Sequence, residues 1–169
     1  MNGSPDERFH AVLGRIDPRR RGLHEGSFDV AGKAVDVQLE LERDGVPLAA
    51  IDAFQRLVDG LSARLGELRA RLVADMEAGA EHAACLYFTH HLDELDDDTL
   101  AELFGTSARH LVEPTAFAAA LVPKSLRVAL YHGDEDATLD LTLPGEVTDY
   151  VLAVRIAVDG SIVDVDMES

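Results

Sequence analysis

The sequence predicts an α+β fold with an antiparallel sheet, made of an N-terminal hairpin and a C-terminal meander of about four strands. Apolar and polar residues alternate with a period of two near both ends of the chain, which is typical of strands with one buried face. Between these regions, apolar residues recur at spacings of three and four, as they do along one side of a helix. This order indicates that a long helix and two or three shorter helices pack on one face of the sheet.

The first strands are predicted on either side of the turn Ala31-Gly32-Lys33. Phe28 and Val30 precede this turn, and an apolar residue then occupies every second position from Val35 to Leu41. This strict alternation places one face of the hairpin in the core and the other in water.

Residues 1–22 are predicted to form an N-terminal arm, and residues 23–169 a single domain. The segment from Asp6 to Leu13 is compatible with a short helix, which Asp17-Pro18 would end. The three arginines that follow, residues 19–21, are interpreted as a solvated basic loop.

The long helix is predicted to begin near Leu48, just after Pro47, and to end at Gly79. Its apolar residues form one stripe, which we interpret as facing the core, although it also suits a partner interface. The members of this stripe are Ile51, Phe54, Leu57, Val58, Leu61, Leu65, Leu68, Leu72 and Met76. Shorter helices are expected from Glu81 to Leu95, after an N-cap in the run Asp96-Asp97-Asp98, and from Glu113 to Leu121.

Four alternating runs in the last part of the chain predict the meander. They cover Leu126–Leu130, Leu139–Leu143, Tyr150–Ile156 and Val163–Met167. Asp159-Gly160 lies between the last two runs and is a strong hairpin signal, because glycine accepts the positive φ that a tight turn requires.

The charge of the chain is strongly asymmetric. Its 32 acidic and 15 basic residues give a net charge of −17, and residues 80–169 alone hold 18 acidic and 4 basic residues. A surface of this kind repels nucleic acid and anionic membranes, so neither is expected as a partner. No apolar run approaches the roughly 18 residues needed to span a bilayer. The single cysteine, Cys85, excludes an internal disulfide and suits a reducing compartment, so the cytoplasm is the expected location.

The polar half of the C-terminal strands is almost entirely carboxylate. We therefore expect an open acidic face on the sheet, formed by Asp140, Asp149, Asp164, Asp166 and Glu168. Such a face suits a basic partner protein, as in an immunity or antitoxin-like protein that imitates phosphate. The alternatives are a merely solvated surface, or an interface on the long Leu-rich helix that joins copies of this chain.

Three stretches resemble an uncharacterised bacterial family known as domain of unknown function 2004. They are Leu86-Tyr87-Phe88-Thr89-His90-His91, Leu103-Phe104-Gly105, and Val147-Thr148-Asp149-Tyr150-Val151-Leu152-Ala153-Val154-Arg155 with the hairpin after it. The resemblance covers roughly residues 80–169. It implies no catalytic residue and no activity.

His90, His91 and Glu94 are the best candidates for metal ligands. His90 and Glu94 are four residues apart on a predicted helix, so both side chains can reach one cation. A metal-binding protein or metal-dependent enzyme would need a further ligand, such as His110 or His132. No motif requires a cofactor and no catalytic residue is assigned, so the sequence favours a non-enzymatic binding protein.

Overall fold

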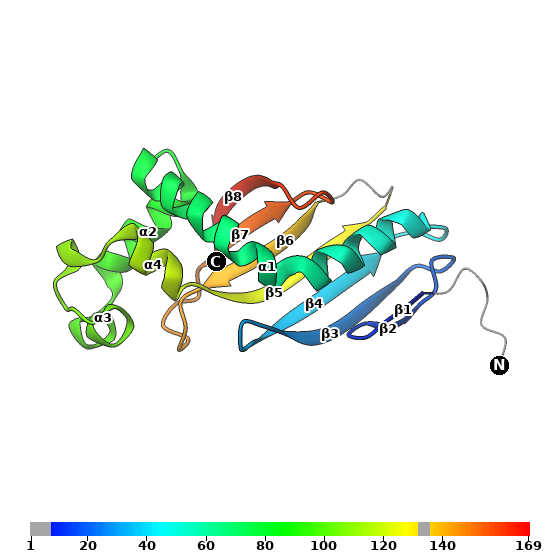
Figure 1. Ribbon diagram of the computed structural model, residues 1–169, viewed down its shortest axis with the longest axis horizontal. Helices are drawn as coiled ribbons and strands as arrows, with labels where there is room; N and C mark the ends of the chain where they lie inside the picture. Colours follow the sequence, from blue (N-terminus) through cyan, green and yellow to red (C-terminus); the bar gives the residue numbers. More distant parts are fainter. Residues whose placement is uncertain (1–7, 132–135) are drawn as a thin grey trace. The chain divides into compact units, whose positions relative to one another are not determined.

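The computed structural model describes residues 8–131 and 136–169 (Figure 1). The chain has eight strands, four α-helices and one 3-10 helix in this part. The elements are β1 Arg8–His10, β2 Gly14–Ile16, β3 Gly22–Val30, β4 Lys33–Leu41, α1 Leu48–Ala78, α2 Ala83–Glu94, α3 Asp97–Phe104, the 3-10 turn Arg109–Leu111, α4 Pro114–Ala120, β5 Val122–Leu130, β6 Ala137–Thr142, β7 Val151–Ile156 and β8 Ile162–Glu168.

Six strands form one sheet in the order β3-β4-β5-β6-β7-β8. The N-terminal hairpin pairs antiparallel from Gly22 with Leu41 to Val30 with Lys33, so its loop is only Ala31-Gly32. Both loop residues have positive φ, 53° and 80°, as a tight two-residue turn requires. The α+β prediction, with its N-terminal hairpin and C-terminal meander, is confirmed.

One pairing differs from the wholly antiparallel sheet that was expected, because β4 and β5 run parallel, with Asp36 opposite Ser125 and Leu41 opposite Leu130. All four helices lie between these two strands in the sequence, and parallel neighbours require a long crossover of this kind. A period-two pattern reports which side chains are buried but not the direction of the neighbouring strand.

The chain divides into two compact units by its internal contacts. Unit 1 comprises residues 1–62, 123–139 and 155–164, and unit 2 comprises residues 63–122, 140–154 and 165–169. Unit 1 holds 16 acidic and 11 basic residues, whereas unit 2 holds 16 acidic and 4 basic residues. Unit 2 therefore carries −12 of the net charge of −17. Whether residues 23–169 act as a single domain stays a prediction.

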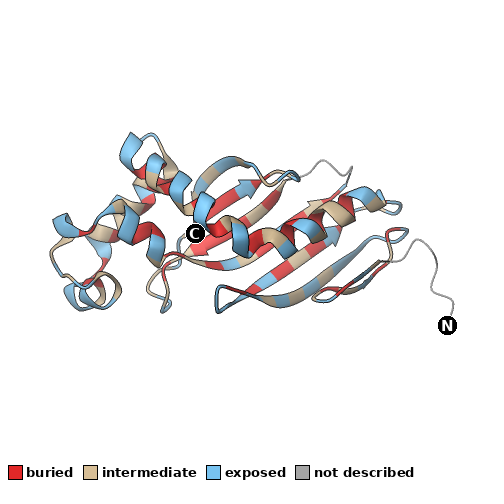
Figure 2. Cartoon of the chain, viewed as in Figure 1, coloured by how far each residue is buried: buried red, intermediate tan, exposed pale blue. Residues whose placement is uncertain are grey.

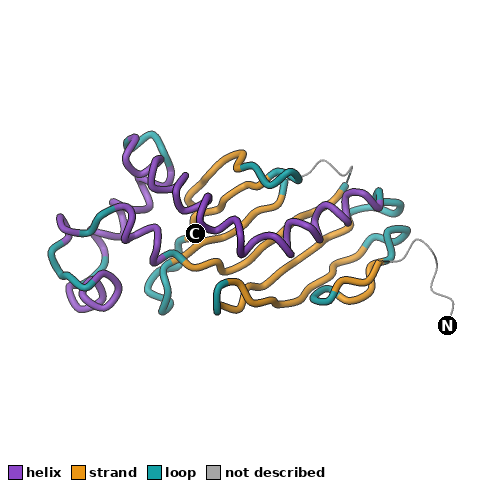
Figure 3. Tube along the Cα trace, viewed as in Figure 1, coloured by secondary structure: helices purple, strands orange, loops and turns teal. Residues whose placement is uncertain are grey.

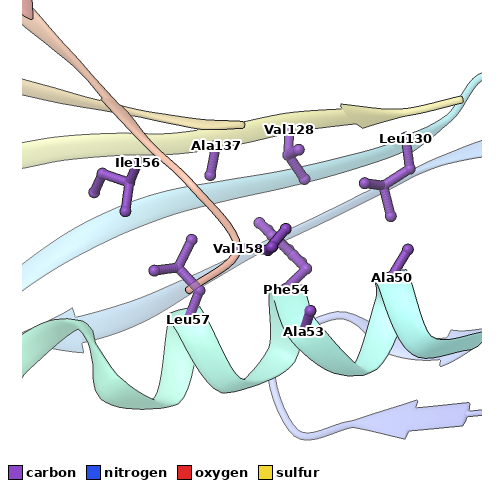
Figure 4. Close-up of a pocket in the computed structure, with 9 residues that line it drawn as sticks. All are labelled: Ala50, Ala53, Phe54, Leu57, Val128, Leu130, Ala137, Ile156 and Val158. Carbon is purple, nitrogen blue, oxygen red and sulfur yellow. The ribbon is translucent and has the colours of Figure 1, made fainter. Parts of the chain in front are cut away.

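The core of unit 1 lies between the first half of α1 and one face of the sheet. In Figure 2, buried positions follow one side of this helix and alternate along the strands. Figure 4 shows Phe54 and Leu57 of α1 facing Val128, Ala137 and Ile156 of the sheet. The hollow between them is about 10 Å³, enough for one water at most, and its lining is apolar. It is a gap in the packing and too small for a ligand.

The apolar stripe of α1 is buried within its own chain. Every member from Ile51 to Met76 is at most 6% exposed. The interpretation of this stripe as core-facing is confirmed, and the hypothesis that copies of the chain associate through it has no exposed stripe to rest on.

The core of unit 2 contains Tyr87 of α2, Leu100 of α3 and Phe117 of α4, all fully buried. The start of α3 follows the predicted N-cap signal. The Asp96 side chain accepts a hydrogen bond from the Thr99 backbone at 2.7 Å, and Gly105 ends α3 in the left-handed conformation.

The N-terminal segment contains a small hairpin in place of the short helix considered for Asp6 to Leu13, and that helix is wrong over its described residues. Arg8–His10 pairs antiparallel with Gly14–Ile16, and Figure 3 shows these strands preceding the larger hairpin. Leu13 and Ile16 are buried, so the hairpin packs against the rest of unit 1. In the described part of the chain, no helix is both long and apolar enough to cross a membrane.

Candidate functional site

Helix α2 carries a buried histidine that is hydrogen-bonded at both ring nitrogens. His91 is 2% exposed, and its Nδ1 lies 2.7 Å from the carbonyl oxygen of Tyr87. A carbonyl oxygen only accepts, so Nδ1 carries the proton. Nε2 then accepts from the Thr148 hydroxyl at 2.8 Å. In the neutral ring, these contacts select the tautomer with its proton on Nδ1.

The same contacts tie α2 to the loop between β6 and β7. The Thr148 hydroxyl accepts the Tyr150 backbone N–H at 3.1 Å, and the Tyr87 hydroxyl donates to the Tyr150 carbonyl at 3.1 Å. The Tyr150 ring also meets the His90 ring edge-on, with centroids 5.0 Å apart. Residues 148–150 are thus held by side chains of α2 at three points.

Burial sets the protonation of this cluster. Desolvation lowers the pKa of His91, a hydrogen bond with the Tyr87 backbone opposes this, and the nearby His90 adds to it. Desolvation likewise raises the pKa of the Tyr87 phenol, while contacts with Thr142 and the Leu143 backbone oppose the shift. Both side chains are consequently neutral near pH 7.

A hydroxyl, an imidazole and an orienting acceptor in a row also describe a nucleophile with its base. Here the Thr148 hydroxyl is engaged twice, with His91 and with the Tyr150 N–H. We therefore interpret the row as a structural tie. Sequence reasoning did not pair Thr148 with His91, because the two residues are 57 positions apart and no spacing rule links them.

The predicted metal ligands do not form a ligand set. His91 would have to break one of its two hydrogen bonds to bind a cation. His90 meets aromatic rings, and Glu94 is exposed at the end of α2. Among the residues that the structure describes, no three His, Cys, Asp or Glu side chains are grouped so that they could hold a metal ion. His132 lies outside the described residues.

The five carboxylates predicted on an open sheet face have different environments. Asp140 is only 6% exposed, so the expectation of an open position is wrong for this residue. Asp164 is exposed but forms an ion pair with Arg155 at 3.1 Å. Asp149, Asp166 and Glu168 are exposed. Asp164 belongs to unit 1 and the other four to unit 2.

A larger set of carboxylates in unit 2 is exposed and lacks an ion-pair partner within the described part of the chain. Nine of them lie in residues 80–169: Asp93, Glu94, Asp98, Glu102, Glu113, Glu146, Asp149, Asp166 and Glu168. Others in this region have a local role. Asp96 caps α3, and this hydrogen bond with Thr99 lowers its pKa, whereas Asp97 pairs with Arg109 at 2.8 Å.

The four basic residues of unit 2 are all engaged within the protein. Arg69 donates to the Leu121 carbonyl at 3.0 Å and Arg71 pairs with Asp75 at 3.0 Å. Arg109 holds Asp97 and the Leu95 carbonyl, and Arg64 also has a partner. The negative surface of unit 2 is therefore not compensated by its own cations.

The resemblance to the domain of unknown function 2004 family stays a prediction. In comparisons with family models, with curated proteins and with solved structures, nothing matches this chain.

Proposed function

We propose that this chain is a non-enzymatic binding protein, and that the acidic surface of unit 2 binds a basic partner protein. The observation that carries the proposal is a set of nine exposed carboxylates that form no ion pair within residues 8–131 and 136–169, in a unit whose four basic residues are all engaged. Uncompensated charges of one sign raise the local concentration of an oppositely charged partner and speed its association.

The carboxylates come from several elements, which suits a broad protein surface better than a single ion. Asp93, Glu94, Asp98 and Glu102 lie on α2 and α3, Glu113 precedes α4, and the remaining four lie in the β6–β7 loop and on β8. A partner with several Lys or Arg side chains would replace water around these groups with ion pairs. We propose that this partner is a cytoplasmic bacterial protein, such as a nuclease that is inhibited by phosphate mimicry.

Crosslinking in the host, followed by mass spectrometry, tests the proposal. The test variant is Asp93→Asn/Glu94→Gln/Glu102→Gln in unit 2. Its matched control is Asp36→Asn/Glu40→Gln/Glu42→Gln, which removes the same charge from exposed positions of unit 1. We expect one basic protein to be crosslinked to the wild type and to the control, and to be lost with the test variant. An equal loss with both variants, or a partner without basic character, would contradict the proposal.

A further inference from the structure

The hairpin β1–β2 approaches α1 through the side chains of Arg8 and His10. Arg8 Nε donates to Asp52 Oδ1 at 3.0 Å, and His10 Nε2 lies 3.4 Å from Asp59 Oδ1. Asp52 and Asp59 are seven residues apart, which is two turns along one side of a helix. All four residues belong to unit 1.

The turn of this hairpin depends on one histidine nitrogen. His10 is 6% exposed, and its Nδ1 lies 3.1 Å from the Val12 backbone N and 3.2 Å from the Leu13 backbone N. Both backbone groups are donors, so Nδ1 must be the acceptor and carries no proton. The neutral ring therefore has its proton on Nε2, which makes no hydrogen bond within the described structure.

The turn in its closed form covers part of β3. A Cβ atom at Gly26 would lie 2.5 Å from the Val12 carbonyl oxygen, so the hairpin approaches this strand as closely as glycine allows. β3 is the terminal strand of the six-stranded sheet, and terminal strands are commonly covered in this way to prevent pairing with other chains.

We propose that His10 is a pH-dependent switch. Its neutral ring holds the N-terminal hairpin on β3 and α1, and its protonation releases the turn. In the neutral ring, Nδ1 is the only nitrogen with a lone pair that can take a proton, so an added proton goes there. An N–H at Nδ1 would face two backbone N–H groups, and both hydrogen bonds of the turn would be lost. Leu13 N belongs to a buried residue, where an unsatisfied donor is costly.

The charged groups around His10 oppose release only weakly. From α1, Asp59 faces the ring but is 73% exposed, so water screens its attraction for an imidazolium. Asp52 is already paired with Arg8. Gly14 of β2 lies opposite His10, and β3 contributes Gly26 at the contact with Val12.

Amide hydrogen exchange and histidine ¹⁵N spectra of the full chain test this His10 switch. At pH 7.5 we expect the Nε2–H tautomer of His10 and protected amides at Val12 and Leu13. When the pH is lowered from 7.5 to 5, their protection, corrected for the intrinsic exchange rate, should fall by about tenfold or more, because one lost buried hydrogen bond has this effect. An Nδ1–H tautomer at pH 7.5, or unchanged protection in a sample whose ¹⁵N spectrum shows the doubly protonated ring of His10, would overturn the proposal.

Three variants separate this His10 switch from general acid unfolding. In His10→Asn, the side-chain amide oxygen can accept hydrogen bonds from the backbone of the turn but does not titrate. The protection of the Val12 and Leu13 amides in this variant should therefore be independent of pH. The matched control His24→Asn, in β3, should keep the wild-type loss, and Asp59→Asn should release the hairpin at a higher pH. Equal pH dependence of amide protection in His10→Asn and the wild type would also reject the His10 switch. If His10→Asn does not fold, the wild-type spectra and exchange data decide between the outcomes.

Discussion

His91 shows how a residue that looks like a metal ligand in the sequence can have a structural task. Its two nitrogens join the Tyr87 carbonyl to the Thr148 hydroxyl, and so fasten the β6–β7 loop to α2. This loop carries Glu146 and Asp149, two of the exposed carboxylates of unit 2. His91 therefore helps to position two carboxylates of the acidic surface, although it is not itself part of that surface.

Replacing Thr148 tests this tie. Thr148→Val removes the donor to His91 and the acceptor for the Tyr150 N–H, so we expect a loss of about 1–3 kcal/mol in the free energy of unfolding. Thr148→Ser keeps the hydroxyl and should stay close to the wild type. Urea unfolding at pH 7.5 measures both, and equal losses in the two variants would show that the hydroxyl contributes nothing.

The stability of the chain should depend on pH through His91. Burial lowers the pKa of His91 below its ordinary value of 6.5, so the unfolded chain binds the proton more tightly than the folded chain. The full contribution is therefore present above pH 6.5 and is lost as the pH falls from there towards the folded pKa. Urea unfolding from pH 7.5 to 5 should show a smaller pH dependence in His91→Gln than in the wild type. His110→Gln, at an exposed position, is the control and should keep the wild-type dependence.

At the scale of the elements, α1 was the easiest to predict from the sequence. Its stripe of nine apolar residues has one period throughout, and the helix runs from Leu48 to Ala78 as expected. The strands β1 and β2 have three residues each, too few for a period to show. The direction of β5 and the burial of Asp140 depend on tertiary neighbours, which alternation along one strand does not report.

Two glycines inside α1 should limit its stability. A Cβ atom at Gly60 or Gly66 would meet nothing within 4 Å, and neither residue has positive φ. We expect Gly60→Ala and Gly66→Ala each to raise the free energy of unfolding by about 0.5–1 kcal/mol, because alanine loses less conformational entropy on folding.

Gly26→Ala is the contrasting change. Its Cβ would lie 2.5 Å from the Val12 carbonyl oxygen, so we expect the variant to be destabilised or its N-terminal hairpin to be displaced. Thermal unfolding of the three variants measures whether each substitution raises or lowers stability. Stabilisation by Gly26→Ala would show that the hairpin does not approach β3 this closely.

At the scale of the whole molecule, the net charge of −17 is concentrated in unit 2, which carries −12. The sequence predicted this acidity but assigned most of it to one face of the C-terminal strands, and the rest to the run Asp96-Asp97-Asp98. The structure distributes the unpaired carboxylates over α2, α3, the start of α4, the β6–β7 loop and β8. Helix capping by Asp96 and the ion pairs of Asp97 and Asp164 account for only a few of the acids.

Calorimetric titration with the crosslinked partner at increasing salt tests most directly whether the uncompensated carboxylates of unit 2 bind a basic protein. We predict that affinity falls steadily as sodium chloride rises from about 0.05 to 0.5 M, because salt screens exposed charges. Asp93→Asn/Glu94→Gln/Glu102→Gln should bind more weakly and with less salt dependence than Asp36→Asn/Glu40→Gln/Glu42→Gln. An affinity that does not change with salt, or an equal loss of affinity in the two variants, would show that these carboxylates do not bind the partner.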